Sequence, residues 1–122
     1  MSSRRISPEE FEACVAEALD SVPPAFARYL ENVVVAVEEE PSDADYDETD
    51  TPDDHELFGI FRGVPFFQRG STVSSLPAQI AIFRGPILRS FATRGEAVRA
   101  IRDTVVHEVG HMLGLDDDEM PY

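Results

Sequence analysis

The feature that most constrains the fold is an amphipathic stretch from about Gly95 to Leu113, near the C-terminal end of the 122-residue sequence. Its apolar residues recur at intervals of three and four, which is the spacing of one face of an α-helix. They are Val98, Ile101, Val105, Val109 and Met112. Thr93 or a neighbour can cap the start, and Gly114 can end the helix in a left-handed turn. The pattern predicts one long helix that packs its apolar face on a sheet.

Helix signals also occur near the start of the sequence. Ser7 can cap a helix, Pro8 suits the first helical position, and Glu10 completes a capping box. A first helix is therefore predicted to reach about Asp20. A second, shorter helix is predicted over Ala25–Leu30, after a pair of prolines.

Three runs of apolar and β-branched residues predict strands, over Asn32–Val37, Leu57–Arg62 and Gln79–Arg84. The first run is apolar on both faces, which is typical of a central strand. A short helix over Pro86–Phe91 should follow the third strand. This order of helices and strands predicts a single α+β domain over residues 1–122.

Residues 38–56 form an acidic segment that contains no Lys or Arg. Like charges repel at this density and the segment has little to bury, so a mobile surface loop is expected. The formal net charge of the chain is -14. Such a charge argues against nucleic acid or an anionic membrane as a partner. A site for cations or basic peptides is the alternative interpretation of the segment.

Several features predict a cytoplasmic protein. No stretch approaches the roughly 20 apolar residues that span a bilayer. The N-terminal residues lack the apolar region of a secretory signal. Cys14 is the single cysteine, so it cannot form an internal disulfide and is expected to be a buried thiol in a reducing compartment.

The predicted last helix carries the motif H-E-x-x-H. His107 and His111 are four residues apart and therefore lie one turn apart on a helix, where both can bind one metal ion. Glu108 lies beside them, where it can act as a general base on a metal-activated water. A catalytic zinc site commonly has three protein ligands and leaves one position for water.

The third ligand is expected just beyond the helix. A left-handed turn at Gly114 would return the chain towards the metal, and the extended motif then places Asp117 at the ligand position. Asp116, Asp118 and Glu119 have the same ligand chemistry and remain alternatives.

The site also needs an acceptor behind a histidine ligand and a donor for the oxyanion, and the sequence offers candidates for both. Asp103 precedes His107 by one turn and is a candidate acceptor for the imidazole nitrogen that faces away from the metal. The oxyanion that develops during hydrolysis needs a further donor, for which Tyr122, His55 and Arg89 are possible.

The stretch "HEVGHMLGLDD" resembles zincin-type metallopeptidases with the motif H-E-x-x-H-x-x-G-x-x-D, as in snapalysin-like enzymes. From Pro24 onward the chain also resembles a family of small bacterial zincin-like proteins, sometimes called minimal metallopeptidases. The segments that carry this second resemblance are "LPAQIAIFRGPI" and "VRAIRDTVVHEVGH".

The resemblance implies a compact α+β zincin-like fold, with a small mixed sheet packed against helices. It implies His107, His111 and Asp117 as ligands of one zinc ion, with Glu108 as the general base. It also implies that the strand over Gln79–Arg84 is the edge along which substrate lies. The sequence departs from the metzincin branch in one feature. In that branch a methionine-containing turn lies well beyond the third ligand, whereas here Met120 and the last residue follow Asp117 closely.

Two hypotheses about function follow. The first is a zinc-dependent metallopeptidase that cuts peptides or a specific protein in the cytoplasm. The second is a metal-stabilised interaction module with little or no activity, whose acidic segment binds a basic partner.

Overall fold

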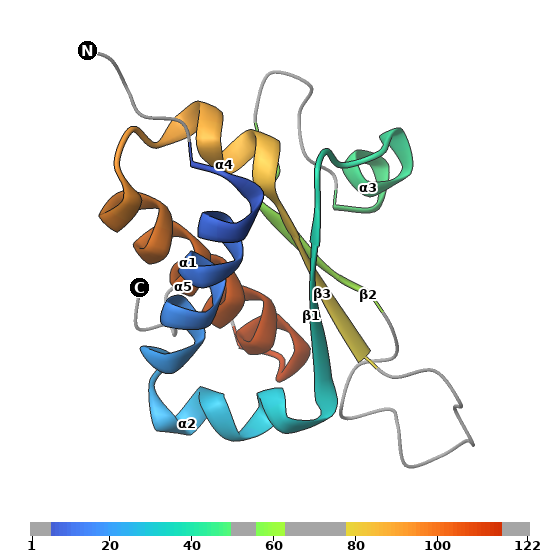
Figure 1. Ribbon diagram of the computed structural model, residues 1–122. Coiled ribbons are helices and arrows are strands. Elements are labelled where there is room, and N and C mark those ends of the chain that lie inside the picture. Colours follow the sequence, from blue (N-terminus) through green and yellow to red (C-terminus); the bar gives the residue numbers. More distant parts are fainter. Residues whose placement is uncertain (1–5, 50–55, 63–77, 116–122) are drawn as a thin grey trace.

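The computed structural model describes residues 6–49, 56–62 and 78–115. In chain order the elements are α1 (Pro8–Asp20), α2 (Pro24–Ala27), the 3-10 helix η1 (Arg28–Asn32), β1 (Val33–Glu38), α3 (Asp43–Thr49), β2 (Gly59–Arg62), β3 (Ala78–Phe83), α4 (Arg84–Ser90) and α5 (Arg94–Met112). Helices α1, α2 and α5 gather on one side of the sheet, and α3 lies on the other side (Figure 1). The predicted α+β class is confirmed. Within the described ranges, none of the helices has the length and hydropathy needed to cross a membrane.

The sheet is mixed, with the strand order β1-β3-β2. Strand β1 runs parallel to β3, with Val33 opposite Ala78, and β2 runs antiparallel to it, with Gly59 opposite Ile82. Two predictions are therefore wrong for the described part of the chain. The run over Asn32–Val37 is a strand at one side of the sheet, and the strand over Gln79–Arg84 is central.

The difference has a physical reason. Three valines of β1 are half-buried against the helices, which makes the run look like a central strand, but Val34 on the opposite face is 50% exposed. Strand β3 is the one with almost every residue buried. Apolar composition alone does not separate a strand that has one covered face from a strand that has two neighbours.

Helix α1 begins and ends as predicted. The Glu10 amide donates to the Ser7 hydroxyl over 3.1 Å, and the Ser7 amide donates to the Glu10 carboxylate over 3.0 Å, which completes the capping box. Its buried face includes Phe11 and Cys14. The predicted helix over Ala25–Leu30 is divided between α2 and η1.

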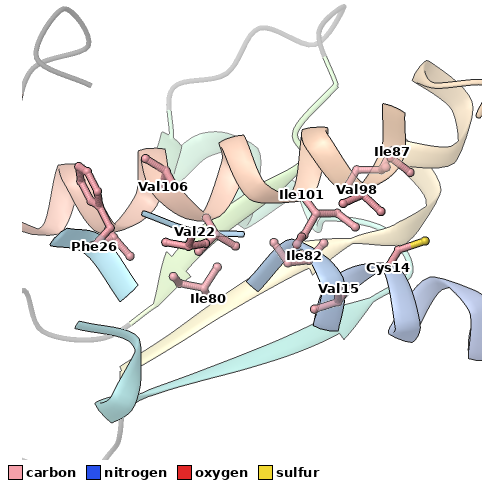
Figure 2. Close-up of a cluster of buried hydrophobic side chains, with 14 of the residues drawn as sticks. Cys14, Val15, Val22, Phe26, Ile80, Ile82, Ile87, Val98, Ile101 and Val106 are labelled. Carbon is pink, nitrogen blue, oxygen red and sulfur yellow. The ribbon is translucent and has the colours of Figure 1, made fainter. Parts of the chain in front are cut away.

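The main core lies between the helices and one face of β3. Ile80 and Ile82 on that face are fully buried among side chains of α1, α2, α4 and α5 (Figure 2). Ala81 and Phe83 on the opposite face form a separate cluster with Ile60 of β2. All five predicted apolar positions of the last helix are buried, so its docking on the sheet is confirmed.

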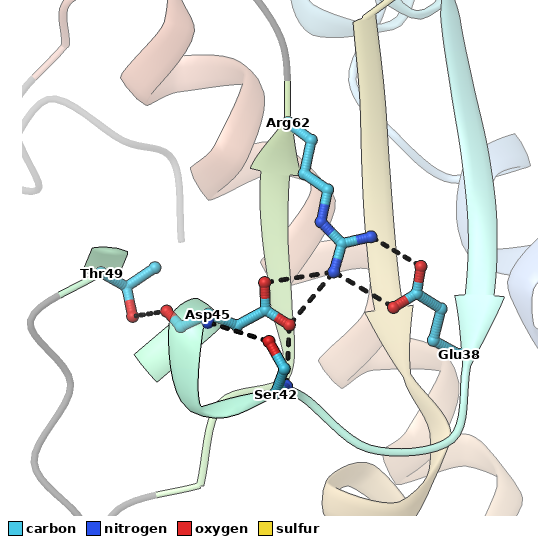
Figure 3. A network of polar contacts seen from close by, with 5 residues as sticks. All are labelled: Glu38, Ser42, Asp45, Thr49 and Arg62. Carbon is cyan, nitrogen blue, oxygen red and sulfur yellow. Dashed lines mark hydrogen bonds and ion pairs between the residues drawn. The ribbon is translucent and has the colours of Figure 1, made fainter. Parts of the chain in front are cut away.

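The acidic segment contains a helix, α3, that was not predicted. Ser42 and Asp45 exchange hydrogen bonds at the start of α3, from the Ser42 amide over 2.9 Å and from the Asp45 amide over 3.2 Å. Arg62 of β2 pairs with Glu38 at 2.6 Å and with Asp45 at 3.1 Å (Figure 3). The expectation of a loop is therefore wrong for the residues of α3, which are helical.

Arginines from distant parts of the chain supply the positive charge that the acidic segment lacks. Besides Arg62, Arg84 pairs with Glu39 at 2.9 Å, and Arg89 pairs with Glu40 at 2.8 Å. A loop was predicted from the repulsion among the acidic residues alone. Ion pairs with arginines distant in sequence could not be included in that prediction. Residues 50–55 lie outside the described residues.

Candidate metal centre

Helix α5 carries the candidate site and is fixed at both ends. Thr93 and Glu96 form a capping box at its start, with the Glu96 amide 3.1 Å from the Thr93 hydroxyl. At its end, the Gly114 amide donates to the His111 carbonyl and the Leu115 amide donates to the Gly110 carbonyl. This pair of bonds is the Schellman motif, and Gly114 has the left-handed φ of 83° that the motif needs. The predicted helix and its glycine stop are confirmed.

The side of α5 that faces away from the core opens on a cleft of about 460 Å³. His107, Glu108 and His111 all line it, together with Gly59 of β2 and residues of the segment before β2. The motif residues are thus brought to one cavity, rather than spread over exposed helix surface.

His107 is held by the backbone of its own helix. Its Nδ1 atom lies 2.9 Å from the carbonyl oxygen of Asp103. A carbonyl can only accept, so Nδ1 carries the proton and the lone pair of Nε2 is available to a metal ion. Asp103 is therefore the acceptor, as the sequence suggested, although through its carbonyl; its carboxylate pairs with Arg102 at 2.9 Å.

His107 and His111 have an arrangement suited to binding one ion between them. Their ring centroids are 6.2 Å apart, with the rings inclined at 71°. His107 is half-buried and His111 is exposed. Imidazole nitrogens are ligands that suit zinc, and the His107 tautomer with its proton on Nδ1 is the one that such binding needs.

The predicted third ligand falls beyond the part of the chain that the structure describes. Within residues 6–49, 56–62 and 78–115, no group of three His, Cys, Asp or Glu side chains is arranged to hold a metal ion. Asp117 lies outside these residues, as do its alternatives Asp116, Asp118 and Glu119, and Met120.

Glu108 contacts the sheet as well as the cleft. The backbone amide of Phe61 in β2 donates to its Oε1 atom over 2.9 Å. Burial raises the pKa of the Glu108 carboxyl above its ordinary value, and His111, the Phe61 hydrogen bond and His107 offset part of this rise. This role of Phe61 could not be predicted from the sequence, because no motif marks a backbone donor 47 residues away.

The cleft has an apolar wall beside its polar floor. Leu57, Phe58 and Phe91 line it, and the two phenyl rings pack with their centroids 5.5 Å apart. Glu56 also lines the cleft, and its carboxylate accepts hydrogen bonds from Arg89.

Of the three candidate oxyanion donors, Arg89 is the one within the described residues, and it does not line the cleft that holds the motif. Arg89 lines a separate cleft of about 500 Å³ and is hydrogen bonded to both Glu40 and Glu56. These contacts hold its pKa above the ordinary value, with Glu40 the larger cause. His55 and Tyr122 lie outside the described residues.

Comparison with known proteins identifies a similar fold and a matching family. A solved structure of a conserved hypothetical protein from T. thermophilus has a similar fold, with a TM-score of 0.58 over 88% of this chain and 94% of that chain, at 21% identity. No curated protein matches the sequence. Residues 30–122 match the family of zincin-like metallopeptidases. Since that match covers most of the chain, the protein belongs to the zincin-like metallopeptidase family.

Proposed function

We propose that the protein is a zinc-dependent peptidase that uses Glu108 as its general base. The observation that carries the proposal is that His107, Glu108 and His111 line one cleft, with the Nδ1 proton of His107 directed to the Asp103 carbonyl. Family membership supports the reaction class and a peptide substrate.

His107 and His111 would hold the zinc ion together with Asp117. When bound, zinc polarises the scissile carbonyl and lowers the pKa of water towards about 7. Glu108 accepts a proton from the attacking water and delivers it to the leaving amine. The Asp103 carbonyl keeps the His107 ring in the orientation and tautomer for binding.

The walls of the cleft indicate the kind of peptide that fits. Leu57, Phe58 and Phe91 offer an apolar surface, so an apolar side chain next to the scissile bond would be favoured there. Strand β2 lies at the side of the sheet nearest Glu108, so we propose β2, rather than β3, as the strand along which substrate lies.

A cytoplasmic, single-domain protein is part of the proposal. Cys14 is fully buried, and the sequence contains no second cysteine with which to form an internal disulfide. Burial raises the pKa of the Cys14 thiol, which keeps it in the unreactive form.

The interaction-module hypothesis has weaker support from the structure. Several carboxylates that were expected to bind a basic partner are paired within the chain, among them Glu38, Asp45 and Glu40. Arg62 and Arg89 already occupy the positions that a basic partner would take.

Metal analysis and a peptide-library digest test the proposed function. The wild-type protein should bind one zinc ion and cut peptides, whereas Glu108→Gln should keep zinc and lose turnover by about a hundredfold or more. Glu12→Gln is the matched control, since Glu12 is exposed on α1. Turnover by Glu108→Gln at the wild-type rate would remove Glu108 from the mechanism.

A further inference from the structure

We infer that strand β2 positions the general base, through the backbone amide of Phe61 and the absence of a side chain at Gly59. This inference rests on the proposed role of Glu108 in catalysis. Neither residue is given a chemical step: both act by fixing where the Glu108 carboxylate lies.

The direction of the Phe61 amide follows from the pairing of β2 with β3. The Phe83 amide donates to the Phe58 carbonyl over 2.8 Å, so this pair is a bonded one. Bonded and non-bonded pairs alternate along an antiparallel ladder, which makes the pair of Phe61 and Ile80 non-bonded. The Phe61 amide therefore points away from β3, and its acceptor is Oε1 of Glu108 at 2.9 Å.

Gly59 explains how α5 comes close enough for this bond. A Cβ atom at residue 59 would lie 2.6 Å from the Cγ2 atom of Thr104 and 2.9 Å from the carbonyl oxygen of Ala81. Thr104 is one turn before Glu108 on the same side of α5. A side chain at residue 59 would push α5 and β2 apart next to Glu108.

The two contacts act together because they are one helical turn apart. The close approach at Thr104 sets the distance between α5 and β2, and the Phe61 amide then holds one oxygen of Glu108. The other oxygen remains as the proton acceptor. A carboxylate held in this way does not need to be ordered by the substrate, which is the advantage of a preorganised site.

An amide-to-ester change at residue 61 tests the hydrogen bond with little change of shape. The α-hydroxy acid analogue of phenylalanine, introduced at Phe61, removes the donor and keeps the side chain. We expect kcat to fall about tenfold, because the free energy of a hydrogen bond to a charged group corresponds to about that factor in rate. KM and zinc content should stay unchanged, and in the Glu108→Gln background the ester should cause no further loss.

The matched control is the same ester change at Ile60, whose amide points towards β3 in the alternating ladder. The ester at Ile60 should lower the thermal midpoint by at least as much as the ester at Phe61 does, while leaving kcat close to the wild-type value. Equal loss of kcat with the two esters would show that β2 acts only through general stability and would overturn the inference.

Hydrogen exchange gives a second readout that needs no activity. In the metal-free protein the Phe61 amide should exchange slowly, and in Glu108→Ala it should exchange at least about tenfold faster. The Ile60 amide should be unaffected. An unchanged rate for Phe61 would overturn the inference even if the wild type is active. Protection that depends on Glu108 in a protein that cuts no peptide would instead refute the proposed function and leave the contact established.

The contribution of Gly59 can be tested by rescue. Gly59→Ala should lower kcat, and adding Thr104→Ser, which removes the Cγ2 methyl, should restore part of the loss. The contact with the Ala81 carbonyl remains in the double variant, so the recovery should be incomplete. A folded double variant with no more activity than Gly59→Ala would exclude the helix-spacing role of Gly59.

Discussion

The guanidinium of Arg62 lies 3.1 Å from the carboxylate of Asp45, the buried charged residue at the start of α3. The same guanidinium lies 2.6 Å from Glu38 at the end of β1. This arrangement connects both outer strands of the sheet to the acidic segment. It supplies positive charge to a segment whose own charges repel.

Removing Arg62 should destabilise the fold. In Arg62→Met, Asp45 keeps the hydrogen bonds of Ser42 but loses its cation while remaining buried, which should cost about 1–3 kcal/mol in the free energy of unfolding. Urea denaturation measures the difference. Arg94→Met is the matched control, because the ion pair of Arg94 with Glu17 is 45% and 55% exposed and should contribute less to stability than the Arg62 pair. Equal losses in both variants would contradict the role given to Arg62.

Stability should fall in acid in a way that depends on Asp45. Burial alone would raise its pKa, but hydrogen bonds from the Ser42 backbone and from Arg62 outweigh this and hold the pKa below its ordinary value. A lowered folded pKa gives stability that is complete above the unfolded value of about 3.9 and is lost as pH falls through the folded value. Unfolding free energies measured from about pH 6 to pH 2 should therefore decline less steeply for Asp45→Asn than for wild type. Parallel curves would contradict the prediction.

Zinc should stabilise the protein through the two histidines. A ligand that binds only the folded state adds about 2.7 kcal/mol at a free concentration a hundred times its Kd. The thermal midpoint should rise with zinc and return with a chelator, and His107→Ala and His111→Ala should each abolish the rise. Asp117→Ala should weaken zinc binding, and a full zinc response in that variant would move the third ligand to Asp116, Asp118 or Glu119.

Gly114→Ala should lower stability by about 1 kcal/mol, because its φ of 83° is costly for any residue with a Cβ atom. No atom lies within 4 Å of the position that this Cβ would take, so the cost is one of backbone conformation. The zinc affinity should also fall, since the turn directs the chain towards the proposed third ligand. Gly95→Ala is the control: its Cβ would make only an ordinary contact with Arg99, and the change should be neutral or stabilising.

Features set by neighbouring residues could be read from the sequence. The capping box of α1, the extent of α5 and its glycine stop depend on side chains within a few positions of one another. Helical spacing also predicts that His107 and His111 lie one turn apart with Glu108 beside them, whereas the cleft that they line is formed with residues distant in sequence. The interactions that determine the helical features join residues within one or two helical turns.

Features set by distant residues could not be read in this way. The order of the strands depends on which face each strand buries, and the pairing of Arg62 with Asp45 joins residues that are 17 apart. The hydrogen bond from Phe61 to Glu108 joins residues that are 47 apart. Its donor is a backbone amide, which every residue except proline possesses. No pattern of side chains distinguishes that amide from its neighbours.

The parallel pairing of β1 with β3 has a consequence for how the protein matures. Val33 and Ala78 are opposite each other, so α3 and β2 both lie in the loop that closes when these strands meet. Contacts of such high sequence separation are made late and slowly, after local helices have formed. During folding, helix α5 with His107 and His111 can therefore form before the sheet has placed β2 beside it, so the hydrogen bond between the Phe61 amide and Glu108 would belong to the later steps.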